Sequence, residues 1–378
     1  MSMPQGLISL LLPALLFAIP SNAEVVHLRD GADPVDAVRI AFVPGALEVV
    51  TPAGESQRFT LDRIARIDDL TDPILIDQWR RLETAALDVW RARSRLQRGD
   101  PELARALFRR HFAPRAGDEG DHEFALIIAE GLLRCLLDSG DTEAILPAAL
   151  ETLRLRRAGI DTDCFQELPS VIDARVWLLP QLPPVATSEP SLARLEDDLR
   201  PWLMDSDPLV SRLAELYAFM GSRSVRPSGS LEPGVVFMEA ILGTRSLDGE
   251  LRRDSLQTLA ELSTVDDAPE FFDSWHAWFS ATSRLASGEV PTDRVVLGLL
   301  ELPAVHHGSH PLLASRAVDL SARVLSREGR NDESDALKRV LLESPRGVPA
   351  TLTPRLLPLN DSRGTASDTT PDLETENE

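Results

Sequence analysis

The sequence contains almost no lysine. Lys338 is the single lysine, so 38 of the 39 basic residues are arginine, and 60 acidic residues give a formal net charge of −21. Such an acidic chain repels phosphate backbones and anionic lipid headgroups, so we expect neither nucleic acid nor an anionic membrane as a partner. The predominance of arginine is typical of a GC-rich genome and fits a bacterial protein.

Cysteine is also scarce, and Cys135 and Cys164 are the only two. In an oxidising compartment they can form a disulfide, which would stabilise the fold by about 3 kcal/mol if the effect is mainly on the entropy of the unfolded chain. The alternative is a pair of thiols, one of them in a helix core. The sequence leaves both interpretations open.

Sequence patterns that signal catalysis are missing. The chain has no serine-nucleophile elbow, no glycine-rich phosphate loop and no His-Glu-x-x-His pattern. Its acidic pairs lack the oxygen spacing, the glycine and the distal glutamate of calcium loops. We therefore expect a protein that is not an enzyme and that holds no cofactor.

Long hydrophobic runs are absent except near the start, where residues 6–19 form an apolar run of 14 residues. A transmembrane helix needs roughly 20 apolar residues, so this run is too short to span a bilayer. Ser21 and Ala23 place small residues where signal peptidase reads them, although no lysine or arginine precedes the run. We interpret residues 1–23 as a signal peptide cleaved after Ala23, and expect a secreted or periplasmic protein without an integral membrane segment after processing.

Residues 24–70 have the pattern of a small β-strand module. The segments 25–28, 38–43 and 46–50 are rich in β-branched residues and are separated by Gly-containing turns. Three to five short strands fit an SH3-like barrel or an open meander. A segment this short buries little surface alone, so we expect the module to dock on the first helices.

From residue 71 the apolar residues recur with a helical period. Leu75, Trp79, Leu82 and Ala86 fall on one stripe at three- and four-residue steps. Similar leucine-rich segments recur as far as residue 345. The expected organisation is a helical hairpin array over 71–180, a Pro-rich linker over 181–190, a second helical array over 191–345 and a disordered Pro-rich, acidic tail over 346–378.

Four short turns separate these leucine-rich segments, at Gly99, Gly140, Gly288 and Gly329. Gly99 to Gly140 and Gly288 to Gly329 are both 41 residues apart. That spacing is typical of helical hairpin arrays, because one hairpin with its turns uses roughly 35–45 residues. Within the first array, the pattern also predicts a helix over 168–179.

The segment around the first of these turns has a recognisable order of residues. Gly99 and Asp100 form the turn, Ala104 supplies a small contact position, and the aromatic Phe108 follows four residues later. This order resembles a tetratricopeptide repeat (TPR), although the period of 41 exceeds the 34 of that family. The resemblance implies a mainly α, TPR-like α-solenoid with a concave surface for a protein or peptide partner. It carries over no catalytic residue.

His306, His307 and His310 lie within five residues and are the best metal-ligand candidates. Three imidazoles can bind zinc or copper, which gives an alternative function as a metal-dependent hydrolase or metal-binding protein. No cysteine or carboxylate at ligand spacing accompanies them. The step from His310 to Pro311 is also explained as the entry to a helix.

An aromatic group at Trp275, Trp278 and Phe279 shares one helix face. Aromatic residues on packed helices bury large areas, so we interpret these three as core residues. The alternative is that they form a platform that binds a partner. With the signal peptide and the hairpin recurrence, the sequence predicts an exported, non-catalytic scaffold or adaptor that mediates protein–protein interaction in the cell envelope.

Overall fold

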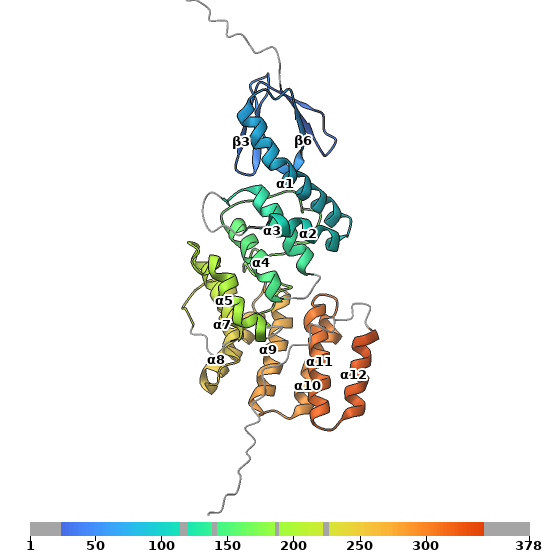
Figure 1. The fold of residues 1–378 in the computed structure, drawn as a ribbon. Helices are drawn as coiled ribbons and strands as arrows, with labels where there is room; N and C mark the ends of the chain where they lie inside the picture. Colours follow the sequence, from blue (N-terminus) through green and yellow to red (C-terminus); the bar gives the residue numbers. More distant parts are fainter. Residues whose placement is uncertain (1–23, 114–119, 138–141, 186–188, 222–226, 344–378) are drawn as a thin grey trace, which may run out of the picture. The chain divides into compact units, whose positions relative to one another are not determined.

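A computed structural model describes residues 24–113, 120–137, 142–185, 189–221 and 227–343 (Figure 1). The predicted signal peptide, the predicted acidic tail and the turn at Gly140 lie outside these residues. The chain divides into two compact units, Met1–Trp90 and Arg91–Glu378. Each unit has its own architecture.

The first unit contains two three-stranded antiparallel sheets. One sheet has the order β2-β1-β6, with β1 at Glu24–Leu28, β2 at Val35–Ala37 and β6 at Ile64–Asp68. The other has the order β3-β4-β5, with β3 at Arg39–Val43, β4 at Ala46–Val50 and β5 at Ser56–Thr60. A short 3-10 helix, η1 (Leu61–Arg63), leads from β5 into β6.

The β3-β4-β5 sheet is a meander, which is one of the two forms that the sequence predicts for this module. Val43 pairs with Ala46 across a two-residue turn in which Gly45 has a φ of +70°, a value that glycine adopts without strain. Farther along the hairpin, Ile40 pairs with Val49, and both side chains are buried. The alternation of apolar residues in β4 therefore builds the small core of this unit.

The module packs on the first half of α1 (Pro73–Gln97), as the sequence predicts. Within this unit the rings of Phe42 and Trp79 stack with centroids 6.2 Å apart. The guanidinium of Arg29 lies over the Trp90 ring at 5.7 Å. These contacts supply the buried surface that the strands alone do not provide.

The second unit is built from helices (Figure 1). In chain order they are α2 (Pro101–His111), α3 (Glu123–Leu137), α4 (Thr142–Arg157), α5 (Glu189–Leu203), α6 (Pro208–Ala218), η3 (Phe219–Gly221), α7 (Pro233–Gly243), α8 (Gly249–Ser263), α9 (Phe271–Ser287), α10 (Thr292–His306), α11 (Pro311–Arg327) and α12 (Asn331–Glu343). Most of the extensive contacts join helices that follow one another in the chain, such as α3 with α4 and α10 with α11. This arrangement is compatible with a helical repeat.

Three turns after helices in this unit share one geometry. Gly99, Gly159 and Gly329 have φ values of +82°, +80° and +79°. In each turn the glycine amide bonds a carbonyl three residues back, and the next amide bonds a carbonyl five residues back. This is the Schellman motif, which favours glycine because of its left-handed backbone. The predicted turns at Gly99 and Gly329 are therefore confirmed, and Gly288 also has a positive φ of +65°.

Close packing joins α2 to α3. Ala104 and Phe108 of α2 are both fully buried, at the small and aromatic positions that carry the TPR resemblance. A Cβ added to Gly131 of α3 would lie 2.3 Å from the Phe108 ring. The Phe108 ring therefore lies directly against the α3 backbone, which requires glycine there.

The predicted helix over 168–179 is wrong. Residues 158–185 form an irregular segment whose one isolated bridge joins Asp173 to Leu178. Neighbouring apolar residues such as Val171 and Ile172 are both buried, which differs from the three- and four-residue period of a helix stripe. Its buried residues therefore do not follow one helix face.

In the stretch predicted as a linker over 181–190, residues 182–185 are buried. Leu182 is fully buried and Val185 is 7% exposed. Side chains from three helices donate hydrogen bonds to its carbonyl oxygens: Trp275 Nε1 to Pro180 (3.3 Å), the Tyr217 hydroxyl to Leu182 (2.9 Å) and Arg316 Nη1 to Val185 (3.2 Å). Proline has no amide hydrogen, so the prolines of this stretch can be buried without a hydrogen-bond acceptor for a backbone N–H group. Residues 182–185 thus form a buried strap inside the second unit.

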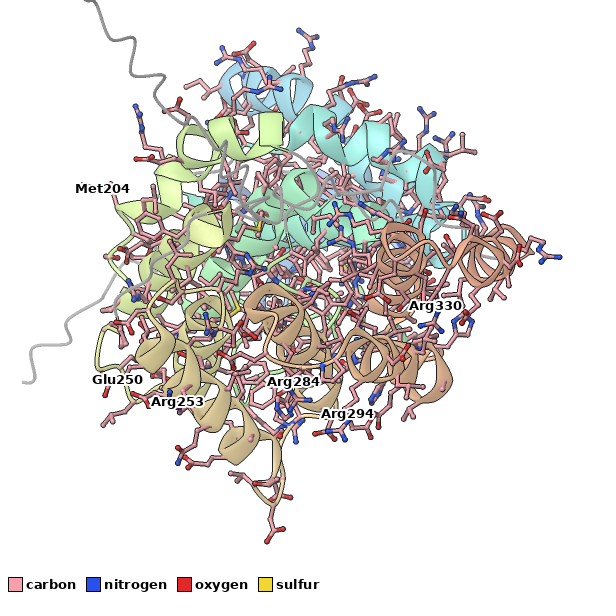
Figure 2. The ribbon with its side chains drawn as sticks, turned by 90° about the horizontal axis from the view of Figure 1, so that it is seen from below. Met204, Glu250, Arg253, Arg284, Arg294 and Arg330 are labelled. Carbon is pink, nitrogen blue, oxygen red and sulfur yellow. The ribbon has the colours of Figure 1, made fainter. Side chains whose placement is uncertain are left out.

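The outward faces of the later helices are charged. Arg253, Arg284 and Arg294 are exposed, and Figure 2 shows their side chains extending away from the helices. Among the residues that the structure describes, none of the helices is sufficiently long and apolar to cross a bilayer.

Candidate functional site

The second unit contains a cavity of about 600 Å³ between helices α3 and α4 and the irregular segment that follows α4. Its volume lies within the range of about 300–1,000 Å³ that is usual for ligand sites. The lining residues are Glu130, Arg134, Arg156, Gly159, Ile160, Asp161, Thr162, Phe165, Gln166, Leu168, Ser170, Val171, Ile172, Ala174 and Trp177. Apolar side chains form the walls, and four ionic groups lie along one side.

The turn at Gly159 begins the irregular segment and determines its direction. The positive φ of Gly159 ends α4, and the next side chain, Ile160, packs on a buried cluster that includes Leu126 and Leu155. The apolar contact between Ile160 and Leu155 is the one that usually accompanies a Schellman motif. Helix α4 therefore ends where the cavity wall begins.

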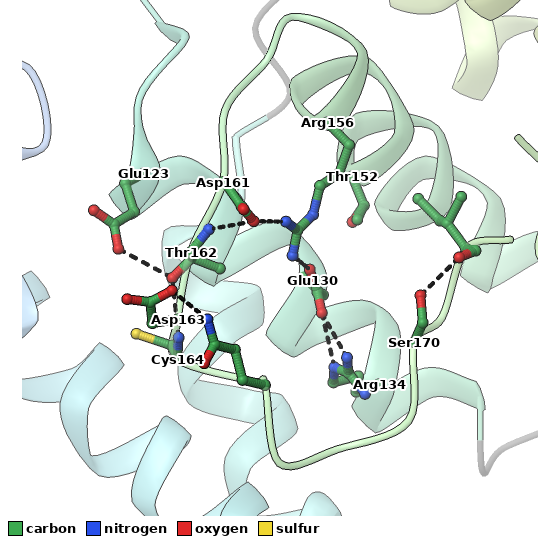
Figure 3. Close-up of polar contacts among 12 residues, drawn as sticks. Glu123, Glu130, Arg134, Thr152, Arg156, Asp161, Thr162, Asp163, Cys164 and Ser170 are labelled. Carbon is green, nitrogen blue, oxygen red and sulfur yellow. Dashed lines mark hydrogen bonds and ion pairs between the residues drawn. The ribbon is translucent and has the colours of Figure 1, made fainter. Parts of the chain in front are cut away.

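Glu130 forms the ionic base of the cavity (Figure 3). Its side chain is only 2% exposed, and both of its oxygens accept hydrogen bonds. Arg134 donates to Oε1 from Nε (3.1 Å) and Nη2 (2.6 Å), and Arg156 donates to Oε2 from Nη2 (2.7 Å). A buried carboxylate needs such paired, hydrogen-bonded partners, because an unpaired buried charge is strongly destabilising.

Arg156 joins the base of the cavity to its rim. Its second terminal nitrogen, Nη1, donates to Asp161, whose side chain is 80% exposed (Figure 3). The pKa of Arg156 is raised above its usual value: burial opposes this rise, but the hydrogen bond and charge of Glu130 outweigh it. Arg156 therefore stays positively charged between one buried carboxylate and one solvated carboxylate.

The irregular segment is braced at several points. Arg134 Nη1 donates to the Pro169 carbonyl at 2.9 Å, and its guanidinium lies over the buried Phe165 ring at 5.2 Å. The Thr162 hydroxyl donates to Glu123 at 3.1 Å, and the Ser170 hydroxyl donates to the Ile172 carbonyl at 2.6 Å (Figure 3). These contacts fix the position of the segment that carries the apolar side chains of the cavity.

Trp177 forms another wall, in an unusual backbone conformation. Its φ of +56° lies in the left-handed region, which is uncommon for a bulky residue and is found most often at functional sites. Arg157 lies over the half-buried indole at 5.1 Å and donates from Nε to Asp207 at 2.8 Å. Burial alone would raise the pKa of Asp207, but the hydrogen bonds from Arg157 and from backbone amides of α6 bring it below its usual value.

The predicted aromatic group lies elsewhere and belongs to the core. Trp275, Trp278 and Phe279 are 0%, 4% and 1% exposed. The Trp275 ring packs with Phe237 and Phe271 at centroid distances of 5.9 and 5.0 Å. This burial agrees with their interpretation as core residues.

The three predicted histidines do not converge. His306 ends α10, His307 is exposed, and the buried His310 precedes α11; the His306 and His310 ring centroids are 6.5 Å apart. Among the described residues, no group of three or more His, Cys, Asp or Glu side chains is placed to hold a metal ion. The alternative of a metal-dependent enzyme thus has no ligand group to support it in this part of the chain.

The disulfide that the sequence left open is not formed in the structure. Cys135 is buried on α3, whereas Cys164 is half-buried beside the cavity segment. Arg93 Nη1 donates to the Cys164 sulfur at 2.8 Å. Both residues are therefore thiols here.

The ionic residues of the cavity are not among the site residues predicted from the sequence. A signal was present: Glu130 is an isolated acid within the apolar helix α3, and Arg134 lies one turn later. An acidic residue on a helix that is buried on nearly all sides predicts a paired carboxylate. The second partner, Arg156, is 26 residues away and has no such local signal.

Comparison with known proteins adds no family to this description. No protein-family model matches the chain, and no curated protein or solved structure is significantly similar to it. The site is thus defined by its own geometry.

Proposed function

We propose that the protein is an exported, non-catalytic scaffold or adaptor, built from TPR-like helical hairpins, that holds another protein of the cell envelope. The observation that carries this proposal is the open cavity whose ionic groups all pair with one another. Glu130, Arg134, Arg156 and Asp161 form one network. Such a cavity presents a concave surface with both apolar and charged side chains, which a segment of a partner protein can contact.

The groups available in the cavity support binding more than catalysis. No histidine or cysteine is among the described residues that line it. The Ser170 hydroxyl is bonded to a backbone carbonyl, and both oxygens of Glu130 are bonded to guanidinium groups. General acid–base catalysis needs a side chain that can reach a reacting group and exchange a proton with it, whereas these oxygens are already engaged in hydrogen bonds within the protein.

Site-specific photo-cross-linking in the cells that produce the protein tests the binding role. A photoreactive amino acid replaces Gln166, which is exposed on the cavity lining, or Arg253, which is exposed on the outer face of α8. We expect a discrete protein adduct from position 166 and none from position 253. The absence of an adduct at position 166, or equal adducts at both positions, would contradict the proposal.

Export is tested separately by cell fractionation and by sequencing the N-terminus of the mature chain. A secreted or periplasmic chain that begins at Glu24 is the expected result. An uncleaved protein that remains in the cytoplasm would contradict this part of the proposal.

A further inference from the structure

The base of the cavity carries a surplus of positive charge. Two guanidinium groups, Arg134 and Arg156, share the single buried carboxylate of Glu130. Among the described residues that line the cavity, the other acid is Asp161, which pairs with Arg156 and is largely exposed to solvent. The buried part of the network is therefore cationic, and its counter-charge is in contact with solvent.

Asp161 is the exchangeable member of this network. Its side chain is 80% exposed, whereas those of Arg156 and Glu130 are 27% and 2% exposed. Exposed ion pairs contribute about 0–1 kcal/mol, so little free energy holds Asp161 on Arg156. A carboxylate that arrives from solvent can replace Asp161 on Nη1 while Nη2 keeps its bond to Glu130. Asp161 would still accept the Thr162 amide, which is 2.8 Å from it.

The walls around this cationic base are apolar. Phe165 is buried, Trp177 is half-buried, and aliphatic side chains such as Leu168 and Val171 complete the lining. A volume of about 600 Å³ is much more than a small inorganic anion requires. A ligand that fits both the cationic base and the apolar lining carries a carboxylate attached to an apolar group.

The rim has the opposite charge to the base. Asp161, Asp163 and Glu167 are exposed within seven residues of the segment that borders the cavity. Asp163 and Glu167 repel a small free anion but attract a chain that carries a cationic residue near its carboxylate. The C-terminus of a polypeptide, with an apolar last residue and a lysine or arginine just before it, meets both conditions.

We propose that the cavity captures the free C-terminal carboxylate of a partner polypeptide on Arg156, with the apolar last side chain against Phe165 and Trp177. This inference rests on the proposed function, because it names the segment that the scaffold would hold. Asp161 occupies Arg156 in the absence of the partner and competes with the incoming carboxylate. Capture of a C-terminal carboxylate is a known mode of peptide recognition, and here it uses a guanidinium.

Fluorescence anisotropy with the mature full-length protein tests the proposal. The probe is a labelled octapeptide that ends in Lys-Lys-Leu-Phe with a free carboxylate, and its control is the same peptide with a C-terminal amide. We expect the free acid to bind at least about tenfold more tightly than the amide. Equal affinity, or no binding of either peptide, would overturn the proposal.

Two variants separate recognition from simple structural support. Arg156→Gln should reduce the affinity of the free acid to that of the amide. Asp161→Asn should instead increase the affinity of the free acid, because it removes the competing negative charge from a side chain that is 80% exposed. Weaker binding by Asp161→Asn would refute the exchange. Arg200→Gln, which breaks an exposed pair on α5, should leave binding unchanged.

Competition with 3-phenylpropionate distinguishes a peptide C-terminus from a small organic acid. If the natural ligand is a peptide C-terminus, phenylpropionate should displace the probe only at concentrations at least about a hundredfold above the Kd of the peptide. Displacement at similar concentrations would assign the cavity to small acids and reject the peptide claim. If photo-cross-linking finds a partner but acid and amide bind equally, this inference fails while the scaffold function stands.

Discussion

A substitution of Gly234 by alanine tests how the cavity wall is held in place. Gly234 is the second residue of α7, and a Cβ there would lie 2.0 Å from the Val176 carbonyl oxygen and 3.0 Å from Leu178 Cγ. Because the nearest atom belongs to the backbone of the segment next to Trp177, a side-chain rotation cannot relieve the clash. Overpacking of this kind costs about 1–3 kcal/mol. Alanine also favours helix over glycine by up to about 1 kcal/mol, so we expect a net destabilisation of about 1–2 kcal/mol.

Thermal denaturation followed by circular dichroism measures this loss. For a domain of 150–250 residues, each 1 kcal/mol lowers Tm by about 2–4 °C, so the expected loss is well resolved. Gly298→Ala in α10 is the matched control, because no atom lies within 4 Å of its added Cβ. That control should be more stable than the wild type by about 0.5–1 kcal/mol. The reasoning is refuted if Gly234→Ala is as stable as the wild type.

Three further measurements follow from the structure. Glu130→Gln should destabilise the protein by about 3 kcal/mol in urea titrations, since it removes the buried carboxylate that two partly buried guanidinium groups share, whereas Arg200→Gln should cost less than about 1 kcal/mol. Burial, aided by the neighbouring histidine, lowers the pKa of His310 to about 4, so the unfolded chain binds a proton that the folded chain lacks between pH 6.5 and 4. Stability should therefore fall as the pH decreases through that window, and His310→Gln should show a shallower fall; equal slopes would contradict the assignment. Thiol titration under denaturing, non-reducing conditions should find two reactive thiols, and a count of zero would show that the disulfide forms in solution.

Much of the fold was predictable because helix boundaries depend on local residues. Asp207 before Pro208 predicts the start of α6, and in the structure the Asp207 carboxylate accepts the amides of Leu209 and Val210. The glycine turns at Gly99 and Gly329 likewise depend on a backbone conformation that glycine adopts best. Signals of this kind act within a few residues, so a single sequence is sufficient to find them.

The cavity was not predictable because it depends on contacts between distant residues. Glu130 and Arg156 are on different helices, and the wall between Phe165 and Trp177 has a composition that also fits a helix. Likewise, the prolines predicted a linker over 181–190, but residues 182–185 are buried, and distant helices donate hydrogen bonds to the carbonyl groups of Leu182 and Val185. The conformation of these segments depends on burial against distant helices, and local propensity contains no information about such burial.

The arginine content that the sequence attributes to genome composition also has a structural use. Three glutamates that are nearly fully buried join separate segments through hydrogen bonds: Glu130 accepts from Arg134 and Arg156, Glu151 from Arg154 and Trp202, and Glu239 from Arg212 and the Ser228 amide. A guanidinium presents several donors in a fixed plane, so one side chain can bond a buried carboxylate and a second acceptor together, which a lysine ammonium does less well. Arg156 has this property at the cavity, where it bonds Glu130 through one nitrogen and Asp161 through the other. Only such a side chain can keep the buried carboxylate paired while it exchanges the exposed one for the carboxylate of a partner.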